Sequence, residues 1–141
     1  EPDPELVIWQ TGTNDALALI DQSDFSETLV SGIDRLQEAG IDVMLMDLQF
    51  YPRVRKADVY ERYVDLMSAV ASSERVALFP RYALMRHWAG SEKALWAGDG
   101  FHLGNLGYRC VAAVLAEAIE RQVEAVRHAE LHPPKTVAAS E

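Results

Sequence analysis

Two short polar motifs in this 141-residue sequence hold the side chains best suited to chemistry. One is Asp99-Gly100-Phe101-His102, an aspartate three residues before a histidine in a glycine-containing loop. At this spacing the carboxylate of Asp99 can accept a hydrogen bond from Nδ1–H of His102, which fixes the tautomer and leaves Nε2 free as a general base. A surface ion pair, or a helix-capping aspartate beside an inert histidine, would give the same pattern.

The other motif is Gly12-Thr13-Asn14-Asp15, which directly follows a short apolar run. At the end of a strand, the side-chain amide of Asn14 could donate a hydrogen bond to an oxygen that gains negative charge during a reaction. A plain strand-to-helix turn would look similar, because Asn and Asp favour turns and helix caps. Each motif alone is therefore ambiguous.

Apolar, β-rich runs predict three buried strands over residues 6–10, 43–46 and 76–79. The periodic apolar residues between and after them predict helices. These are a helical turn over 16–20, a helix with Phe25, Leu29, Ile33 and Leu36 on one face, a helix over 57–72, a helix over 82–97 interrupted at Gly90, and a long final helix marked by residues 108–126. Ser23 or Asp24 is the expected N-cap of the second, and Gly40 its stop. Pro133-Pro134 should end the final helix.

The order of these elements predicts an α/β fold with three layers, α/β/α, built on a parallel sheet. Ligands of such sheets bind beyond the carboxyl ends of the strands. Polar residues follow all three predicted strands, over residues 11–15, 47–53 and 80–82. Gln49, Tyr51 and Arg53 could line the rim of a substrate cleft there, as could Arg81 and Tyr82. Ordinary packing of the aromatic rings and solvation of the arginines is the alternative.

Taken together, the two motifs resemble those of the SGNH (GDSL-like) serine hydrolase superfamily, whose blocks include Gly-x-Asn-Asp after a central strand and Asp-x-x-His before the last helix. The resemblance implies a flavodoxin-like fold and a serine acyl-enzyme mechanism. It implies His102 as general base, Asp99 as its orienting partner and Asn14 as oxyanion donor. It also implies that Gly12 lets the turn close and that Asp15 has a structural role in the same loop.

The Gly-Asp-Ser block of that superfamily, which supplies the nucleophile, does not occur in this chain. None of the serines follows a predicted buried strand, where a nucleophile would be exposed and aimed; they are Ser23, Ser26, Ser31, Ser68, Ser72, Ser73, Ser91 and Ser140. The first strand would moreover lie at an exposed apolar edge, which natural proteins avoid. We expect N-terminal strands and the serine to be supplied by a segment missing from this chain. A three-stranded relic that pairs with a partner through this edge is the alternative.

Two classes of function remain open at this point. One is a carboxylic ester hydrolase, with carbohydrate O-acetyl groups as one expected substrate and long-chain lipid esters or thioesters as competitors. The other is a non-catalytic binding or assembly module that kept the fold without the nucleophile. The sequence upstream of residue 1 would discriminate them.

Composition narrows the partners and cofactors. The 13 basic and 22 acidic residues leave a net charge of −9, which disfavours binding to nucleic acid. No apolar run is long enough to span a membrane. The four histidines lack the usual zinc spacings, so we expect no metal and no cofactor. Residues 1–131 should form part of a single domain and 132–141 a flexible tail. A bacterial periplasmic or secreted location is favoured over a cytoplasmic one.

Overall fold

The computed structural model describes residues 4–90 and 95–131. The chain forms two compact units, residues 1–95 and 96–141. The first contains the strands β1 (Leu6–Gln10), β2 (Asp42–Met46) and β3 (Ala77–Phe79) and the helices α1 (Thr13–Ala18), α2 (Gln22–Glu38), α3 (Ala57–Ser73) and α4 (Arg81–Ala89). The second contains the long helix α5 (Asn105–Leu131).

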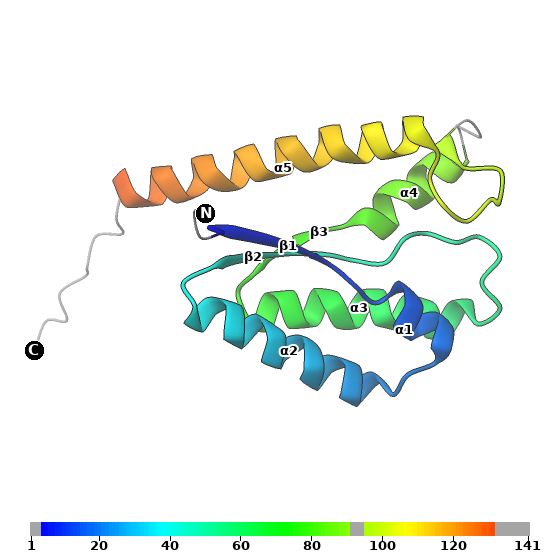
Figure 1. Cartoon of the computed structure of the whole chain (residues 1–141), viewed down its shortest axis with the longest axis horizontal. Helices are drawn as coiled ribbons and strands as arrows, with labels where there is room; N and C mark the ends of the chain where they lie inside the picture. Colours follow the sequence, from blue (N-terminus) through cyan, green and yellow to red (C-terminus); the bar gives the residue numbers. More distant parts are fainter. Residues whose placement is uncertain (1–3, 91–94, 132–141) are drawn as a thin grey trace, which may run out of the picture. The chain divides into compact units, whose positions relative to one another are not determined.

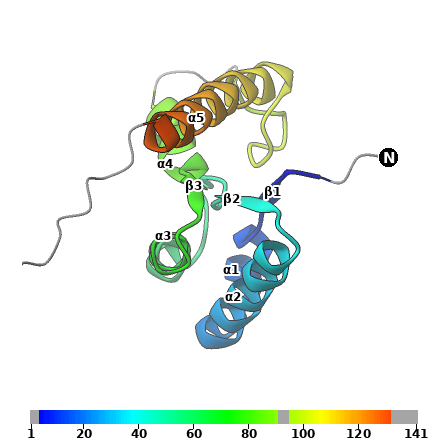
Figure 2. The same ribbon diagram turned by 90° about the vertical axis from the view of Figure 1, so that its left-hand side faces the viewer.

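The three strands form one parallel sheet in the order β1-β2-β3. Figure 1 and Figure 2 show α2 and α3 together against one face of this sheet, with α4 on the other side. Sequential parallel strands joined by helices are the arrangement that the alternation of apolar runs predicted. The predicted strands are confirmed to within one residue at each end, and so is the α/β fold class with a parallel sheet flanked by helices.

The N-cap of helix α2 lies two residues before Ser23 and three before Asp24, the two predicted cap residues. The N-cap is Asp21, whose Oδ1 accepts hydrogen bonds from the backbone N–H groups of Ser23, at 2.8 Å, and Asp24, at 3.4 Å. The predicted caps Ser23 and Asp24 are therefore wrong, because both donate to a carboxylate that precedes them. The predicted stop is confirmed: the helix ends just before Gly40, which has a left-handed φ of +75°.

The core of the first unit lies between the sheet and the pair α2–α3. Helix α3 contributes the fully buried rings of Tyr60 and Tyr63, and the ring of Tyr63 lies 5.2 Å from that of Phe25 on α2. The hydroxyl of Tyr63 donates to the backbone oxygen of Ile20, which ties the loop between α1 and α2 to the core. Trp9 of β1 packs over Gly32 of α2, where a Cβ atom would lie 2.3 Å from the indole ring.

β1 differs from the prediction of a strand buried on both faces. Leu6 and Ile8 are each 38% exposed, whereas Val43 to Met46 of β2 are buried. The reason is that β1 lies at the edge of the sheet and has one strand neighbour among the described residues. Its composition is that of an interior strand, but its position here is that of an edge strand.

The region after β3 also differs from the prediction. Helix α4 ends at Ala89, and Trp96 pairs with Leu103 in an isolated antiparallel bridge, so a helix through residue 97 is wrong. The bridge encloses the loop that carries Asp99 and His102. Ser91 and the predicted tail over 132–141 lie outside the described residues.

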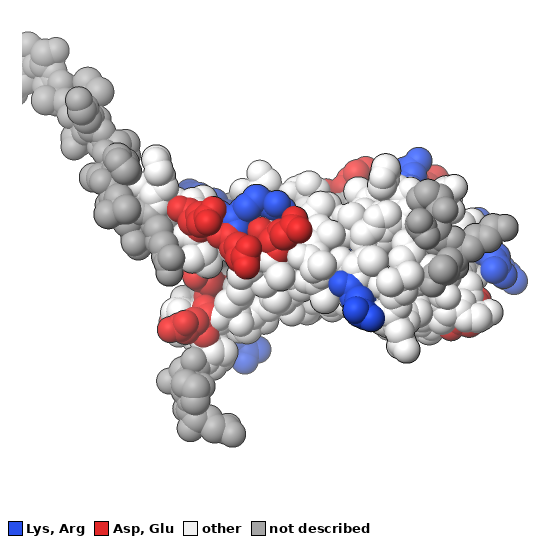
Figure 3. All heavy atoms as spheres, turned by 90° about the horizontal axis from the view of Figure 1, so that it is seen from above, with Lys and Arg blue, Asp and Glu red and all other residues white. Residues whose placement is uncertain are grey.

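Helix α5 contains the predicted final helix and begins at Asn105, ahead of Tyr108. An exposed ion pair forms along this helix between Arg121 Nη1 and Glu117 Oε2, which are 3.7 Å apart. On the face of the molecule in Figure 3, acidic side chains gather towards one end with basic side chains beside them. Exposed pairs of this kind contribute little to stability, so the charge of this helix is best regarded as solvated.

Candidate active site

The turn between β1 and α1 depends on Gly12. Its φ is +89°, a conformation that residues with a Cβ atom rarely adopt. A Cβ atom here would lie 2.7 Å from Leu48 Cδ1 and 3.0 Å from Met67 Sδ, and both of those side chains are fully buried. Glycine therefore allows the turn to pack against the core. This packing explains how Gly12 could let the turn close, the role that the resemblance implied.

The turn places Asn14 and Asp15 in the first turn of α1, immediately beyond the carboxyl end of β1. Asn14 is exposed, so its amide is accessible to a ligand. The amide N–H of Ala16 donates to the backbone oxygen of Gly12 at 3.0 Å, and that bond starts the helix. Asn14 therefore lies on a short helix whose N-cap residue, Gly12, packs against the core.

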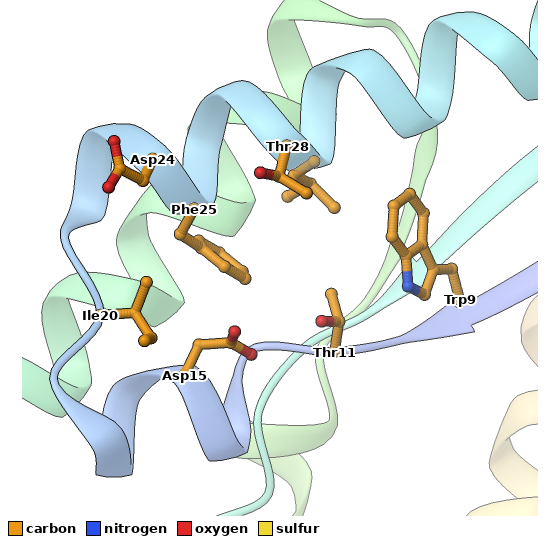
Figure 4. A pocket seen from close by; sticks show the side chains of 8 residues that line it. Trp9, Thr11, Asp15, Ile20, Asp24, Phe25 and Thr28 are labelled. Atoms are coloured by element: carbon orange, nitrogen blue, oxygen red, sulfur yellow. The ribbon is translucent and has the colours of Figure 1, made fainter.

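Asp15 lines a pocket of about 140 Å³ between β1, α1 and α2 (Figure 4). Trp9 and Phe25 supply most of its aromatic wall, and Asp24 adds a second carboxylate at its mouth. The pocket lies within the first unit alone. Asp15 therefore belongs to this pocket, whereas Asn14 is not among the residues that line it.

A buried carboxylate follows β2, and it was not among the predicted site residues. Asp47 is 2% exposed, and its Oδ1 accepts a hydrogen bond of 2.7 Å from the backbone N–H of Tyr82 in the first turn of α4. Pro80, the N-cap residue of α4, makes no side-chain cap. Asp47 therefore caps this helix from the neighbouring strand. Burial raises the pKa of Asp47 to about 6, although its bond to Tyr82 and the nearby guanidinium of Arg81 both favour the carboxylate.

Arg81 is 5% exposed and connects the ends of all three strands. Its Nε donates to the backbone oxygen of Asp47 at 3.1 Å, and its Nη2 lies 3.4 Å from Thr13 Oγ1. Arg81 was predicted to lie at a substrate rim or in solvent, but its burial shows that its guanidinium lies below the surface. The sequence feature that could have indicated this burial is the position of Arg81 directly after a strand and a proline.

Of the predicted rim residues, Gln49 lies closest to the Asn14 loop. Its backbone N–H donates to Thr13 Oγ1 at 3.1 Å, and its backbone oxygen accepts a 2.7 Å bond from the hydroxyl of Tyr60. Gln49 is 9% exposed, Tyr51 is partly buried and Arg53 is exposed. The three residues therefore pass from the buried strand end outward to solvent.

The loop before α5 brings Asp99 and His102 into direct contact. Asp99 Oδ2 lies 2.6 Å from His102 Nδ1, and Asp99 Oδ1 accepts the backbone N–H groups of Phe101, at 2.9 Å, and His102, at 3.0 Å. The hydrogen bond from His102, followed by those two backbone bonds, lowers the pKa of Asp99 to about 2. Because an ionised Asp99 accepts from Nδ1–H, the Nε2 atom of His102 is left as the basic nitrogen.

Two further contacts hold this loop in shape. The backbone N–H of Ala97 donates to the oxygen of His102 at 2.8 Å, and Gly100 supplies a left-handed φ of +65° at the tip. The ring of Phe101 packs edge-on against the imidazole, with 4.6 Å between centroids. The side chain of His102 is 56% exposed, so a substrate could reach it.

The Asn14 loop belongs to the first unit and the Asp99–His102 loop to the second. That the two loops converge on one pocket stays a prediction from the sequence. The serines within the described residues all lie in α2 and α3, on Ser23, Ser26, Ser31, Ser68, Ser72 and Ser73. Ser91, Ser140 and His132 lie outside the described residues.

Among the described residues, no three His, Cys, Asp or Glu side chains lie close enough together to hold a metal ion. None of the helices in residues 4–90 and 95–131 has the length and apolarity needed to cross a bilayer.

Comparisons with known proteins identify a matching family and a similar solved structure. The model of the Non-GDSL lipase-like family matches residues 1–125. Among solved structures, the crystal structure of TesA, an SGNH hydrolase, superposes with a TM-score of 0.65 at 25% identity, over 77% of this chain and 58% of that chain. No curated protein sequence matches this chain.

The chain therefore belongs to the Non-GDSL lipase-like family, within the SGNH/GDSL-like superfamily that the two motifs indicated. This membership supports a hydrolase-like function. The chain spans well under two thirds of the length of TesA.

Proposed function

We propose that this chain supplies the base, its orienting carboxylate and one oxyanion donor of a serine ester hydrolase. The observation that carries the proposal is the 2.6 Å contact between Asp99 Oδ2 and His102 Nδ1 in an exposed loop. Asn14, exposed beyond the carboxyl end of β1, is the matching donor. Family membership and the likeness to TesA support the hydrolytic class.

In the proposed reaction, a serine hydroxyl oxygen attacks the acyl carbon of the ester and its proton passes to His102 Nε2. The carbonyl electrons move to the acyl oxygen, which Asn14 stabilises with its amide N–H. Collapse of this intermediate expels the alkoxide, which takes the proton from His102. A water molecule then repeats the sequence on the acyl-enzyme and releases the acid, so Asp99 stays ionised throughout.

The substrate that we propose is a small carboxylic ester, with an O-acetyl group on carbohydrate as the leading case. A solvent-accessible His102 and an exposed Asn14 suit a substrate that approaches from the surface. Gln49, Tyr51 and Arg53 extend from the end of β2 into solvent and are proposed to contact the alcohol or acyl part.

The serine is proposed to come from a further segment that pairs with the free edge of β1. Glu5 and Thr11 direct their backbone groups to β2. Because backbone groups alternate in direction along a strand, those of Leu6, Ile8 and Gln10 point to the other edge. An added strand would bond to these groups and cover the exposed side chains of Leu6 and Ile8.

Hydrogen exchange tests this strand addition, with neighbouring residues as internal controls. In this chain alone, the amides of Val7 and Trp9, which face β2, should exchange slowly, and those of Ile8 and Gln10 quickly. In the complete protein all four should be slow. Fast exchange at Ile8 and Gln10 in the complete protein would contradict the pairing.

Hydrolysis of p-nitrophenyl acetate by the complete protein tests the catalytic assignment. Changing His102→Ala should abolish turnover, and Asn14→Ala should lower kcat by about 10²–10³-fold, as removal of one oxyanion donor does. Asn14→Asp keeps the shape but removes the donor, so it should be at least as damaging. His87→Ala, on the exposed side of α4, is the matched histidine control and should leave kcat unchanged. Unchanged rates in the His102 and Asn14 variants would refute the assignment.

A non-catalytic module of the same fold is the second candidate. It is favoured by the position of the described serines, all of which lie within α2 and α3 rather than at strand ends. Absence of turnover by the complete protein, together with retained binding of an acetylated sugar, would support this candidate over the enzyme.

A further inference from the structure

The side chain of Thr13 lies where the ends of all three strands meet, directly beside the proposed oxyanion donor. Its Oγ1 accepts the backbone N–H of Gln49 at 3.1 Å, from the segment after β2. It also lies 3.4 Å from Nη2 of Arg81, which follows β3. Thr13 itself follows β1 by way of Gly12. One hydroxyl oxygen thus joins three segments that are far apart in the sequence.

The hydroxyl of Tyr60 joins this cluster from α3. Burial raises the pKa of Tyr60, and the nearby hydroxyl of Thr13 lowers it by a smaller amount. Tyr60 in turn donates its own hydrogen to the backbone oxygen of Gln49 at 2.7 Å. A hydroxyl oxygen has two lone pairs, so Thr13 Oγ1 can accept from both Gln49 and Arg81.

The partners of Thr13 are themselves held rigidly. Arg81 is 5% exposed and its Nε donates to the backbone oxygen of Asp47 at 3.1 Å. Tyr60 is 1% exposed within the core. Networks of satisfied polar groups in a buried setting specify one geometry, because any shift leaves a buried group without its bond.

We propose that Thr13 is a positioning residue for Asn14, and that Arg81 and Gln49 set the place of Thr13. An oxyanion donor lowers the barrier only when it already points at the place where charge develops. Asn14 is exposed and next in sequence to Thr13, so the buried hydroxyl network is what fixes its backbone. This inference rests on the proposed function and adds to it the device that orients the donor.

The test uses Thr13→Val, which keeps the shape and removes the hydroxyl, and Thr13→Ser, which keeps the hydroxyl. In the complete protein, we expect Thr13→Val to lower kcat for p-nitrophenyl acetate by about 10–100-fold, since small displacements of a positioned group cost that much. KM should change by less than about twofold, because the transition state and not the bound ester is affected. Thr13→Ser should recover most of kcat. Thr28→Val, at an exposed threonine of α2, is the matched control and should behave as wild type.

The outcomes separate this inference from the proposed function. An active wild type with an equally active Thr13→Val variant would overturn the positioning role and leave the hydrolase assignment intact. A fall in both Thr13 variants alike would also overturn it, because the hydroxyl would then not be the cause. A wild-type protein without turnover would refute the proposed function and this inference with it.

Hydrogen exchange in this chain gives a second readout that does not depend on activity. Loss of the Thr13 hydroxyl removes the acceptor of the Gln49 amide, so Thr13→Val should speed exchange at Gln49 while leaving the control variant unchanged. Unaltered exchange at Gln49 would overturn the network on which the inference stands.

Discussion

Replacing Gly12 by alanine tests how closely the Asn14 loop is pressed against the core. A residue with a Cβ atom at a φ of +89° loses about 1–2 kcal/mol relative to glycine. The added atom would also lie 2.7 Å from Leu48 Cδ1 and 3.0 Å from Met67 Sδ. Overpacking of a full core adds about 1–3 kcal/mol, so we expect a total loss of about 2–5 kcal/mol in the free energy of unfolding.

Gly40→Ala is the matched control, because Gly40 also has a positive φ, of +75°, but nothing lies within 4 Å of its would-be Cβ. It should lose the backbone cost alone, about 1–2 kcal/mol. Gly90→Ala should leave the free energy of unfolding nearly unchanged, because Gly90 has a φ of −82° and open space around its would-be Cβ. Urea unfolding of the three variants, followed by circular dichroism, gives these differences. Equal losses in Gly12→Ala and Gly40→Ala would refute the argument that packing adds to strain at Gly12.

Two further predictions concern pH. Burial raises the pKa of Asp47 to about 6, so the folded protein binds this proton more tightly than the unfolded chain, and stability is greatest below pH 4 and falls as the pH rises through 6. Asp47→Asn lacks this dependence. The difference in free energy of unfolding, variant minus wild type, should therefore rise by about 3 kcal/mol between pH 4 and pH 8. The same difference at both pH values would contradict the raised pKa of Asp47. The Asp99 carboxyl should titrate near pH 2 by ¹³C NMR, and nearer its ordinary pKa in His102→Ala, where its strongest hydrogen-bond partner is gone. An unshifted midpoint in wild type would show that the two side chains are not in contact. Because the pKa of Asp99 is lowered, its contribution to stability is present above pH 4 and is lost as the pH falls through 2.

The sheet and its helices could be predicted because their apolar residues follow simple periods. Phe25, Leu29 and Ile33 recur at the spacing of a buried helical face, and the structure buries all three. The contact between Asp99 and His102 was likewise accessible, since three residues of chain suffice to bring the two side chains together.

The network around Thr13 was not accessible from the sequence. Its members are separated by 36 residues for Gln49 and 68 for Arg81, and no local pattern connects them. An arginine after a strand is predicted to lie at the surface, because Arg is seldom buried. Its burial here depends on acceptors that only the folded sheet provides. The exposed edge of β1 was predicted from the sequence, whereas the partial exposure of Leu6 and Ile8 was not, because the apolar composition of this strand is typical of one buried on both faces.

The bonds at Gln49 have a consequence for how this fold can diversify. Its backbone N–H and backbone oxygen are both bonded to other parts of the first unit, so the chain is clamped at the point where it leaves the sheet. Residues 51–53, which follow this clamp and are partly or largely exposed, can therefore change without moving the floor of the site, whereas Phe50 and Val54 pack against the core. Relatives that handle different ligands would be expected to differ most in this segment, while the residue on either side of the clamp keeps its place.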